Sequence, residues 1–430
     1  MFGLRKMSTQ SRPLDVITIG GSLAGLMASI ALRRQGHHVR IFEQAPTPLL
    51  HDQGAGIVAG GETQRFLEQY DRTKTPNSVP SHTRLYLNKK GGIIHEESSL
   101  QHMTSWDLLY NIYRSNFDGI KTDYISQDRH DRAQQGAPGE GTYQHGRRVA
   151  KLEHAGDKVK VFYHSTIKDD DQNQIKVEEA DLVVLAEGAS SAIRKQLCPS
   201  APPKKYAGYV AFRGTISETD LSSKAAEVFI EKFPFFHDKG IQILAYVIPG
   251  KNGSVEPGHR LLNWVWYWNI EDMESNEYKA VFTDKHGQSH RWTLPPGDNM
   301  SEEVWTRQKQ RATDLLPPQF AEAVCKTKSP FVQAVADLEP SDSGVWKMDE
   351  KVVLVGDAVA GFRPHTAAST SQAAFHALRL GNVFAGEIGR DDYEREVMEY
   401  ATHMQKHGVE LGQRSQFGDH PLSGGYGQAP

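Results

Sequence analysis

An amino-terminal stretch constrains the fold more than any other part of this chain. An apolar run, Val16–Ile19, leads into the glycine-rich hexapeptide Gly20-Gly-Ser-Leu-Ala-Gly25. A helical pattern of apolar residues follows, and a second apolar run, Val39–Phe42, ends directly before Glu43. Strand, glycine-rich turn, helix, strand and acidic residue in this order predict a dinucleotide-binding fold.

The residue types of this stretch suit a dinucleotide. Gly20 permits the tight turn after the strand, and Gly25 permits close packing of helix on strand. The helix N-terminus offers free N–H groups to a pyrophosphate. The usual second glycine of the motif is Ser22, which adds a hydroxyl donor. Glu43 is placed to accept from both hydroxyls of an adenosine ribose. The predicted cofactor contacts here are Gly20, Ser22, Leu23, Ala24, Gly25, Glu43 and Gln44.

A second candidate segment lies near the other end of the chain. The apolar run Val352–Val355 stops at Gly356-Asp357, and after Pro364-His365 small residues open a long helical pattern from Thr366. A helix N-terminus with small side chains lets a flat, anionic ligand approach the backbone. Asp357 suits a sugar or ribityl hydroxyl. An ordinary strand–loop–helix connection with a capping Thr or Ser explains the same residues equally well.

The pattern changes at Tyr206. Before it, apolar runs alternate with helical patterns; after it, Tyr209–Gly214, Ile241–Ile248 and Leu261–Ile270 alternate as antiparallel strands, until Trp346 returns the chain to the first domain. We expect an α/β protein with a Rossmann-like domain and an inserted, mainly antiparallel β-sheet domain. The predicted first domain comprises 14–80, 104–205 and 346–430, and the predicted sheet domain comprises 81–103 and 206–345.

Several shorter segments also carry predictions. We interpret residues 1–13 as a loose leader, Gly54–Ile57 as a flexible loop and 127–141 as a solvated surface excursion. A hairpin is expected from Arg84 to Ile94, a helix from Met103 with Ser105 and Asp107 as possible caps, and a helix over 302–320 that Pro317-Pro318 breaks. Trp264, Trp266 and Trp268 share one face of a strand. We favour core packing for at least two of these three residues. The alternative interpretation is that they form an aromatic wall over a flat ligand.

Composition excludes several classes of protein. The chain of 430 residues has a net charge of -4 and no basic block, which disfavours nucleic acid as a partner. Its mean hydropathy is -0.54, and no apolar run is long enough to cross a membrane. The two cysteines, Cys198 and Cys325, form no CxxC motif and indicate a reducing, cytoplasmic location without disulfides. No metal-ligand spacing occurs.

Three separated motifs together carry a family resemblance. They are GGSLAG with Glu43, Glu187-Gly-Ala-Ser-Ser-Ala-Ile-Arg194, and Gly356-Asp357 with Pro364-His365. In this order and spacing the chain resembles the single-component (group A) FAD-dependent aromatic hydroxylases, the class of para-hydroxybenzoate and salicylate hydroxylases. The segments GGSLAGL, TSWDLLY, YVAFRG, RPHTAAST and HGVELGQRSQ resemble its 2,6-dihydroxypyridine 3-monooxygenase-like branch most.

The resemblance implies a para-hydroxybenzoate hydroxylase-like fold and a flavin monooxygenase. NAD(P)H would reduce FAD, O₂ would add to it, and the flavin C4a-hydroperoxide would hydroxylate an electron-rich, phenol- or hydroxypyridine-like ring. The resemblance places the backbone of Thr366, Ala367, Ala368 and Ser369 beside the flavin, with Gly56 and Ser105 completing the cofactor set, and implies a homodimer. Departures from the family pattern are Glu187 for Asp, Ala360 for His, and Ala367 and Ser369 for glycines.

The substrate site is expected between the flavin edge and one face of the sheet. The predicted substrate-binding residues are Tyr209, Arg213, Tyr246, Trp266 and His365, of which Arg213, His365 and Tyr209 are the predicted catalytic residues. Arg213 either pairs with a substrate anion or belongs to a structural ion pair. His365 either moves a proton or simply leads into the helix after Pro364.

Other functions on the same fold stay open at this point. Relatives epoxidise, perform Baeyer–Villiger insertion or decarboxylate oxidatively, and a non-catalytic binding protein is the alternative from another class. A flavin halogenase is disfavoured because Trp264–Asn269 breaks the Trp-x-Trp-x-Ile-Pro pattern. A disulfide reductase is disfavoured because the chain has neither a second GxGxxG motif nor a CxxC pair.

Overall fold

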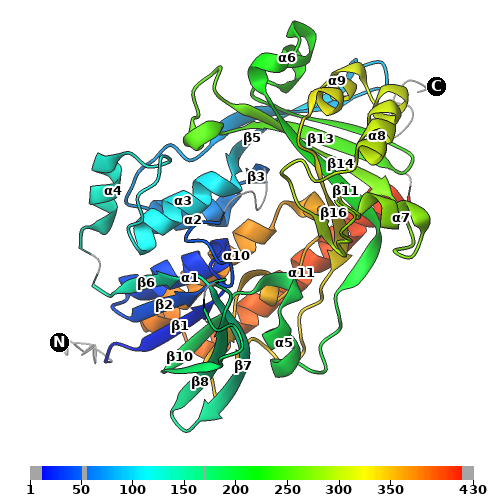
Figure 1. The fold of residues 1–430 in the computed structure, drawn as a ribbon. Helices are drawn as coiled ribbons and strands as arrows, with labels where there is room; N and C mark the ends of the chain where they lie inside the picture. Colours follow the sequence, from blue (N-terminus) through cyan, green and yellow to red (C-terminus); the bar gives the residue numbers. More distant parts are fainter. Residues whose placement is uncertain (1–11, 51–55, 137, 169, 419–430) are drawn as a thin grey trace, which may run out of the picture.

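The computed structural model describes residues 12–50, 56–136, 138–168 and 170–418 (Figure 1). Among these residues, no helix is both long and apolar enough to cross a bilayer. The chain forms two layered regions, one around a six-stranded sheet and one around a nine-stranded sheet.

The six-stranded sheet is parallel except at one edge, where β17 and β18 run antiparallel. Its strands are buried because helices cover one face and a small three-stranded sheet covers the other, which explains their continuous apolar sequences. In order across the sheet they are β17 (Trp346–Lys347), β18 (Val352–Leu354), β10 (Leu182–Leu185), β1 (Asp15–Ile19), β2 (His38–Phe42) and β6 (Gly141–Gln144).

The layers on either side of this sheet come from distant parts of the sequence. On the helical side α1 packs against α3 and α10. The helices of this region are α1 (Leu23–Arg34), α2 (Gly61–Tyr70), α3 (Trp106–Phe117), α4 (Gln127–Gln134), α5 (Ala192–Leu197) and α10 (Ser369–Phe384). The three-stranded sheet comprises β7 (Arg147–Ala155), β8 (Lys158–Ser165) and β9 (Lys176–Ala180).

The nine-stranded sheet is antiparallel except where β12 pairs with β4. Helices α6 (Ser223–Phe229), α8 (Glu302–Leu315) and α9 (Pro318–Lys326) pack on one face, and α7 (Asn276–Val281) lies near its edge (Figure 1). Its strands, in order, are β15 (Thr293–Leu294), β16 (Phe331–Asp337), β11 (Lys205–Ser217), β14 (Leu261–Asn269), β13 (Ile241–Ile248), β12 (Lys232–Asp238), β4 (Val79–Leu87), β5 (Ile93–Ser105) and β3 (Gly56–Val58).

The two faces of this sheet have separate cores. Trp264 and Trp266 of β14 lie on the helix-covered face, whereas Val265 and Tyr267 lie on the face that looks toward the six-stranded region. Alternation along the strand separates the two sets. The second face, which also carries Tyr209 of β11, is the one that meets the other region of the molecule.

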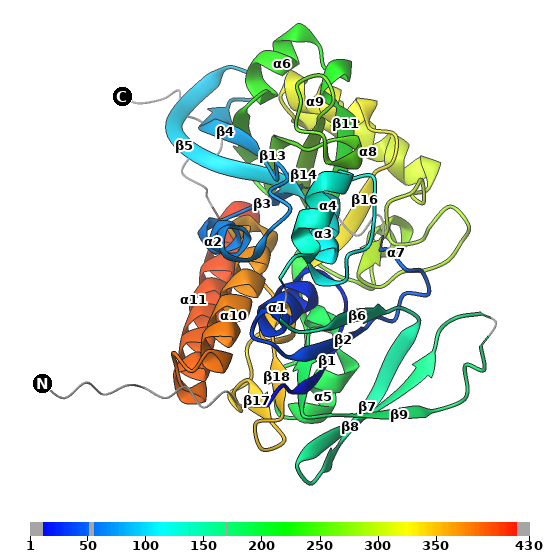
Figure 2. The ribbon, with the colours of Figure 1, turned by 90° about the vertical axis from the view of Figure 1, so that its left-hand side faces the viewer.

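The long helix α11 (Arg390–Gln416) connects the two regions. It lies beside α10 and reaches the nine-stranded sheet at its C-terminal end (Figure 2). There the Ser415 hydroxyl donates to Gln242 Oε1 at 2.6 Å, and the Asn269 side-chain amide donates to the Gln416 carbonyl at 2.8 Å. The helix therefore fixes the position of β13 and β14 relative to the six-stranded region.

The predicted α/β architecture is confirmed, with local differences. The 127–141 segment is not a mere surface excursion, because Gln127–Gln134 forms α4 and buries His130 and Ala133. Gly56 and Ile57 lie in β3, paired with β5, rather than in a loop. Gly54 and Ala55 of that loop, and residues 1–11 of the predicted leader, lie outside the described residues. The helix after Pro364 begins only at Ser369.

That late helix start has a backbone cause. Pro364–Thr366 forms a 3₁₀ turn, and Ala367 then adopts φ of +50°, which interrupts helical geometry until Ser369. The first N–H groups of α10 therefore follow a tight left-handed bend instead of a regular helical lead-in.

Candidate active site

The glycine-rich turn after β1 accepts only glycine at two positions. Gly20 has φ of +100°, and a Cβ there would lie 2.5 Å from the Ala186 carbonyl oxygen. A Cβ on Gly25 would lie 1.9 Å from the Gly20 carbonyl oxygen. Ser22 is the N-cap of α1 but makes no capping hydrogen bond. The first N–H groups of α1 are thus left to a ligand at the helix N-terminus.

Glu43 closes this turn from the end of β2. Its Oε2 accepts from the Gly21 N–H at 2.7 Å, and its Oε1 accepts from the Ala45 N–H at 2.8 Å. The side chain is only 7% exposed. Two backbone donors therefore hold the carboxylate in place beside the turn.

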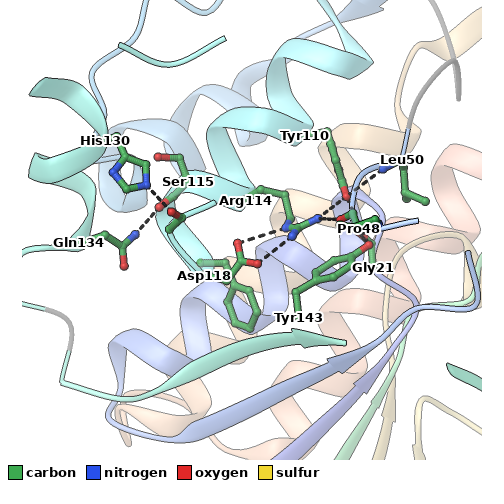
Figure 3. Close-up of polar contacts among 12 residues, drawn as sticks. Gly21, Pro48, Leu50, Tyr110, Arg114, Ser115, Asp118, His130, Gln134 and Tyr143 are labelled. Carbon is green, nitrogen blue, oxygen red and sulfur yellow. Dashed lines mark hydrogen bonds and ion pairs between the residues drawn. The ribbon is translucent and has the colours of Figure 1, made fainter. Parts of the chain in front are cut away.

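A buried network supports the turn from behind (Figure 3). The Arg114 guanidinium stacks on the Tyr143 ring at 3.6 Å, forms a bidentate pair with Asp118 and donates to the Tyr110 hydroxyl at 2.6 Å. The Tyr143 hydroxyl in turn donates to the Gly21 carbonyl at 3.2 Å. A Cβ on Gly21 would meet that hydroxyl at 2.2 Å, so this glycine is required by close packing.

These elements surround an elongated cavity of about 650 Å³, which we call the glycine-loop cavity. It extends from the turn at Gly20 past the ends of β2 and β10 to the start of α10. Its lining comprises Ile19–Ala24, Phe42–Pro46, Leu50, Trp106, Arg147–Val149, Ala186–Gly188, Asp357, Ser369, Thr370 and Ala373.

Asp357 lies at the far end of this cavity, on the turn after β18. Burial raises the pKa of its carboxyl to about 6. A hydrogen bond from Ser369 and the charge of Lys204 lower this pKa, but by less than burial raises it. The turn is held by His376 of α10, whose Nδ1 accepts from the Gly356 N–H at 3.0 Å. Burial lowers the pKa of His376 to about 3, so its ring is neutral at ordinary pH.

A second cavity of about 490 Å³, the sheet cavity, lies between α10, α11 and the nine-stranded sheet. It shares Ser369 and Thr370 with the glycine-loop cavity, so the two are continuous at the α10 N-terminus. Most of its wall is apolar or aromatic. Its lining includes Gly56–Val58, Arg84, Arg213, Phe233, Phe235, Leu244, Tyr246, Val265, Tyr267, Phe362–Ser371, Tyr400 and Met404.

Arg213 is the cation of the sheet cavity without an acidic partner. No described carboxylate forms an ion pair with it, and its buried Nε has no hydrogen-bond partner. Arg84, by contrast, pairs with Glu97 at 3.1 Å, and Arg363 forms a bidentate pair with Asp337. Tyr246 and Tyr267 lie close enough to Arg213 that its charge opposes the rise in pKa that burial gives their hydroxyls.

His365 forms the other polar part of this wall. Its Nε2 lies 2.8 Å from the Tyr209 hydroxyl, and its ring packs against Tyr267 at 4.2 Å between centroids. Burial, with the charge of Arg363, lowers the pKa of His365 to about 3. The residue therefore offers a neutral imidazole to the cavity, not a cation.

Comparisons with known proteins show what the chain is similar to. The family model described as FAD binding domain-like matches residues 206–337. The 2,6-dihydroxypyridine 3-monooxygenase of Paenarthrobacter nicotinovorans is 28% identical over 376 residues, which is 86% of this chain and 82% of that enzyme. The 6-hydroxynicotinate 3-monooxygenase of Bordetella bronchiseptica is 24% identical over 403 residues, 89% and 85% of the two chains. Over most of its length the chain is similar to FAD-dependent aromatic hydroxylases.

Solved structures support the same fold for this chain. The 2,6-dihydroxypyridine-3-hydroxylase from Arthrobacter nicotinovorans superposes with a TM-score of 0.76 at 24% identity, over 97% of this chain and 98% of that one. Klebsiella pneumoniae HpxO complexed with FAD and uric acid superposes with a TM-score of 0.68 at 17% identity, over 95% and 90%.

The residues of this chain fit FAD. The helix N-terminus and the glycines with no room for a Cβ form a cradle for a pyrophosphate, and Glu43 offers a carboxylate where an adenosine ribose belongs. The glycine-loop cavity then leads past Asp357 to Ser369, where the ring system of FAD would enter the sheet cavity. The chain, an FAD-dependent monooxygenase, thus has a matching cofactor track.

Most predicted cofactor residues lie along this track. Those that line the glycine-loop cavity are Gly20, Ser22, Leu23, Ala24, Glu43, Gln44, Asp357 and Ser369. Those that line the sheet cavity are Gly56, Thr366, Ala367, Ala368 and Ser369. Gly25 lies beneath the turn and lines neither. Ser105 also lines neither, since its hydroxyl accepts from the Leu108 N–H as the N-cap of α3.

Two predicted substrate residues lie away from the sheet cavity. Trp266 packs on the helix-covered face of the sheet and is fully buried, because β14 turns its even-numbered residues toward α8 and α9. Tyr209 is also fully buried, behind His365, so it contacts the histidine rather than the cavity. Arg213, Tyr246 and His365 do line the cavity.

Several residues that line the two cavities have no predicted role in the sequence analysis. Trp106 lines the glycine-loop cavity and stacks on Tyr110 at 4.7 Å between ring centroids. Tyr267 lines the sheet cavity, whereas its sequence neighbour Trp266 lies on the opposite face of the same strand. Tyr400 and Met404 line the same cavity from α11, at the i, i+4 spacing of one helix face.

The unusual Glu187 also belongs to the cofactor track. It lines the glycine-loop cavity, and the Ser191 hydroxyl donates to its Oε2 at 2.6 Å. Burial raises the pKa of the Glu187 carboxyl. Ala360 is fully buried, and its carbonyl accepts from the Gln372 amide at 2.9 Å, so no side chain at this position reaches the track.

Proposed function

We propose that this chain uses NAD(P)H and O₂ to hydroxylate an electron-rich aromatic ring that carries an ionisable hydroxyl, such as a phenol or a hydroxypyridine. Arg213 carries this proposal, because it is a cation in an aromatic cavity with no acidic partner among the described residues. Curated relatives named for dihydroxypyridine and hydroxynicotinate hydroxylation support the same ring class.

The wall of the sheet cavity favours a flat anion. Tyr246 and Tyr267 provide aromatic surfaces, and the Arg213 guanidinium can donate charge-assisted hydrogen bonds to the anionic oxygen of a phenolate or a deprotonated pyridinol. An anionic ring oxygen makes the neighbouring ring carbon more nucleophilic. Arg213 would therefore bind the reactive form of the substrate and orient it toward the junction of the two cavities.

Bound FAD supplies the redox and oxygen-activating chemistry of such a reaction. The chain supplies the surroundings. The first N–H groups of α10, from Ser369, have no acceptor within the helix and favour negative charge at the junction of the cavities. Phe233, Phe235 and Leu244 provide an apolar wall that excludes water from the reacting ring.

The pair His365–Tyr209 would hold the remaining polar group of the substrate. His365 lines the cavity as a neutral imidazole, and Tyr209 fixes its Nε2 from behind. A neutral imidazole can exchange a hydrogen bond with a ring hydroxyl without placing a second positive charge beside Arg213. His365 is thus in position to hold a ring hydroxyl through a hydrogen bond.

The test is product analysis with isotopically labelled O₂. Purified protein with FAD is given NADH or NADPH and a panel of hydroxypyridines, phenols, ketones and alkenes. We expect one labelled oxygen in a hydroxypyridine or phenol product, and loss of that product in Arg213→Met with FAD content unchanged. Oxygen incorporation only into a ketone or alkene, or hydrogen peroxide as the sole product with every arene, would contradict the proposal.

We also propose a cytoplasmic homodimer. The support is the resemblance to a family whose members pair, together with two cysteines that form no disulfide in the structure, Cys198 being buried and Cys325 exposed. Light scattering of the reduced holoprotein should give twice the chain mass, and a single-chain mass would contradict the dimer.

A further inference from the structure

A third cavity of about 190 Å³ opens beside the other two, and none of the roles described above uses it. Its rim carries the half-buried Lys204 and Trp292 and the exposed Thr293. Its floor reaches Asp357 and Pro364. We call it the lysine cavity.

Lys204 has no carboxylate partner at ion-pair distance among the described residues. Its ammonium nitrogen lies 4.2 Å from the centre of the Trp292 ring, a cation–π contact. Burial lowers its pKa, and the charge of Asp357 across the cavity opposes that shift. The cavity thus presents an aromatic plane and a cation together, and Gln333 of β16 adds a side-chain amide to the same wall.

The lysine cavity adjoins both of the other cavities. It shares Asp357 with the glycine-loop cavity, and Phe362 and Pro364 with the sheet cavity. Arg213 and its neighbours lie in the sheet cavity, not here. A ligand in the lysine cavity would therefore approach the ring of bound FAD without displacing a substrate from Arg213.

The chemistry of the lining matches one class of ligand. A nicotinamide dinucleotide has a flat ring with a carboxamide, and a pyrophosphate two bonds beyond its ribose. Trp292 can stack on the ring, the Gln333 amide can pair with the carboxamide, and Lys204 at the rim can bind a phosphate oxygen. The chain has a single dinucleotide fingerprint, which the FAD track uses, so a second dinucleotide requires a separate site.

We propose that the lysine cavity, with Lys204 and Trp292 at its rim, is the docking site of the nicotinamide end of NAD(P)H. This inference rests on the proposed function, in which NAD(P)H reduces the bound FAD. Lys204 and Trp292 act as binding residues for the reductant, distinct from the residues that bind the aromatic substrate.

The test compares Lys204→Ala and Trp292→Ala with the wild-type holoprotein. Lys205→Ala is the matched control, since Lys205 is the exposed neighbour and does not line the cavity. Anaerobic stopped-flow reduction of bound FAD over a range of NADH and NADPH concentrations gives the Kd of the reductant. Binding of a non-reducing tetrahydro analogue, followed by fluorescence, measures the same site without any turnover.

We expect each cavity variant to raise the Kd for the reductant and the analogue by about tenfold or more. The Lys205→Ala protein should match the wild type. FAD content, the absorption spectrum of bound FAD, reduction by dithionite and the Kd of the aromatic substrate should stay unchanged in all variants.

Failure of the proposed function and failure of this docking inference give different results. If neither NADH nor NADPH reduces the wild-type holoprotein with any aromatic present, the proposed function fails. If the wild type is reduced and the variants keep its Kd, the reductant docks elsewhere and this inference is wrong. If Trp292→Ala changes the spectrum of bound FAD but not the Kd of the reductant, the cavity serves the FAD ring itself, which also overturns the inference.

Discussion

The hydroxyl oxygen of Tyr209 lies 2.8 Å from Nε2 of His365, and this contact joins strand β11 to the turn that precedes α10. Tyr209 is fully buried, and a Cβ on Gly412 of α11 would come within 2.5 Å of its hydroxyl. Sheet, turn and long helix therefore meet at one hydroxyl group. The position of His365 in the sheet cavity depends on all three.

Replacing Tyr209 with Phe tests this dependence. The variant removes the hydrogen bond to His365 without changing the wall of the sheet cavity, so we expect kcat to fall about tenfold with the Kd of FAD unchanged. Tyr206→Phe is the matched control, because Tyr206 lies on the same strand and loses a 2.6 Å bond to the Ile270 carbonyl. Equal kinetic losses in the two variants would show that Tyr209 acts only through stability.

The sequence was sufficient to predict the cofactor half of the site. Gly20, Gly25 and Glu43 are constrained locally, by backbone conformation and by strand ends, so the order of residues along the chain already specifies their geometry. Asp357 was found for the same reason, since it follows a buried strand of the same sheet. Local rules apply because parallel strands end at one edge of the sheet.

The substrate half depended on information that one strand does not carry. Asn263–Asn269 is largely apolar on both faces, so the alternation of residues does not show which face meets the cavity. The predicted residue Trp266 lies on the helix-covered face, and its neighbour Tyr267 lies on the face that meets the cavity. Tyr400 and Met404 reach the cavity from α11, which follows β14 by more than a hundred residues in the sequence. Such contacts follow from how helices and sheets pack against each other, which the pattern of one segment does not specify.

The neighbours Trp266 and Tyr267 give a matched pair for substrate binding. Trp266→Ala opens a large hole in the helix-covered core, so we expect a loss of about 3–5 kcal/mol in the free energy of unfolding. Because Trp266 does not line the sheet cavity, its milder variant Trp266→Phe should keep the Kd of the aromatic substrate within about twofold. Tyr267→Ala should raise that Kd by about tenfold.

Perturbation of the FAD absorption spectrum by titrated substrate measures these Kd values. Urea unfolding of the same samples gives the stability of each variant. A larger change in Kd for Trp266→Phe than for Tyr267→Ala would reverse the assignment of the two faces.

Glycine substitutions test the cradle for the cofactor. Gly25→Ala forces a Cβ to within 1.9 Å of the Gly20 carbonyl oxygen, a backbone atom that cannot rotate away as a side chain could. We expect this variant to lose FAD on dialysis and to unfold at lower urea concentration. Gly61→Ala, where no atom lies within 4 Å of the new Cβ, should keep FAD as the wild type does. Retention of FAD by Gly25→Ala would contradict the assignment of the turn.

Asp357 links the stability of the apoprotein to pH in a direction opposite to most carboxylates. Burial raises its pKa from 3.8 to about 6 in the folded chain. Between these values the folded state holds a proton that the unfolded state has released, so stability falls as pH rises through this window. Above it, the buried charge costs on the order of 3 kcal/mol.

Asp357→Asn removes that cost because an amide does not ionise. We expect the variant apoprotein to be more stable than the wild type at about pH 8, with the difference vanishing at about pH 4. Asp123→Asn, at an exposed position, is the control and should follow the wild-type curve. The same Asp357→Asn change should weaken FAD binding at about pH 8, since an acceptor for a ribityl hydroxyl is lost. Urea midpoints of the three apoproteins across this range, with FAD titrations on the same samples, measure both effects. Parallel pH curves for Asp357→Asn and wild type would show that no buried charge develops at this position.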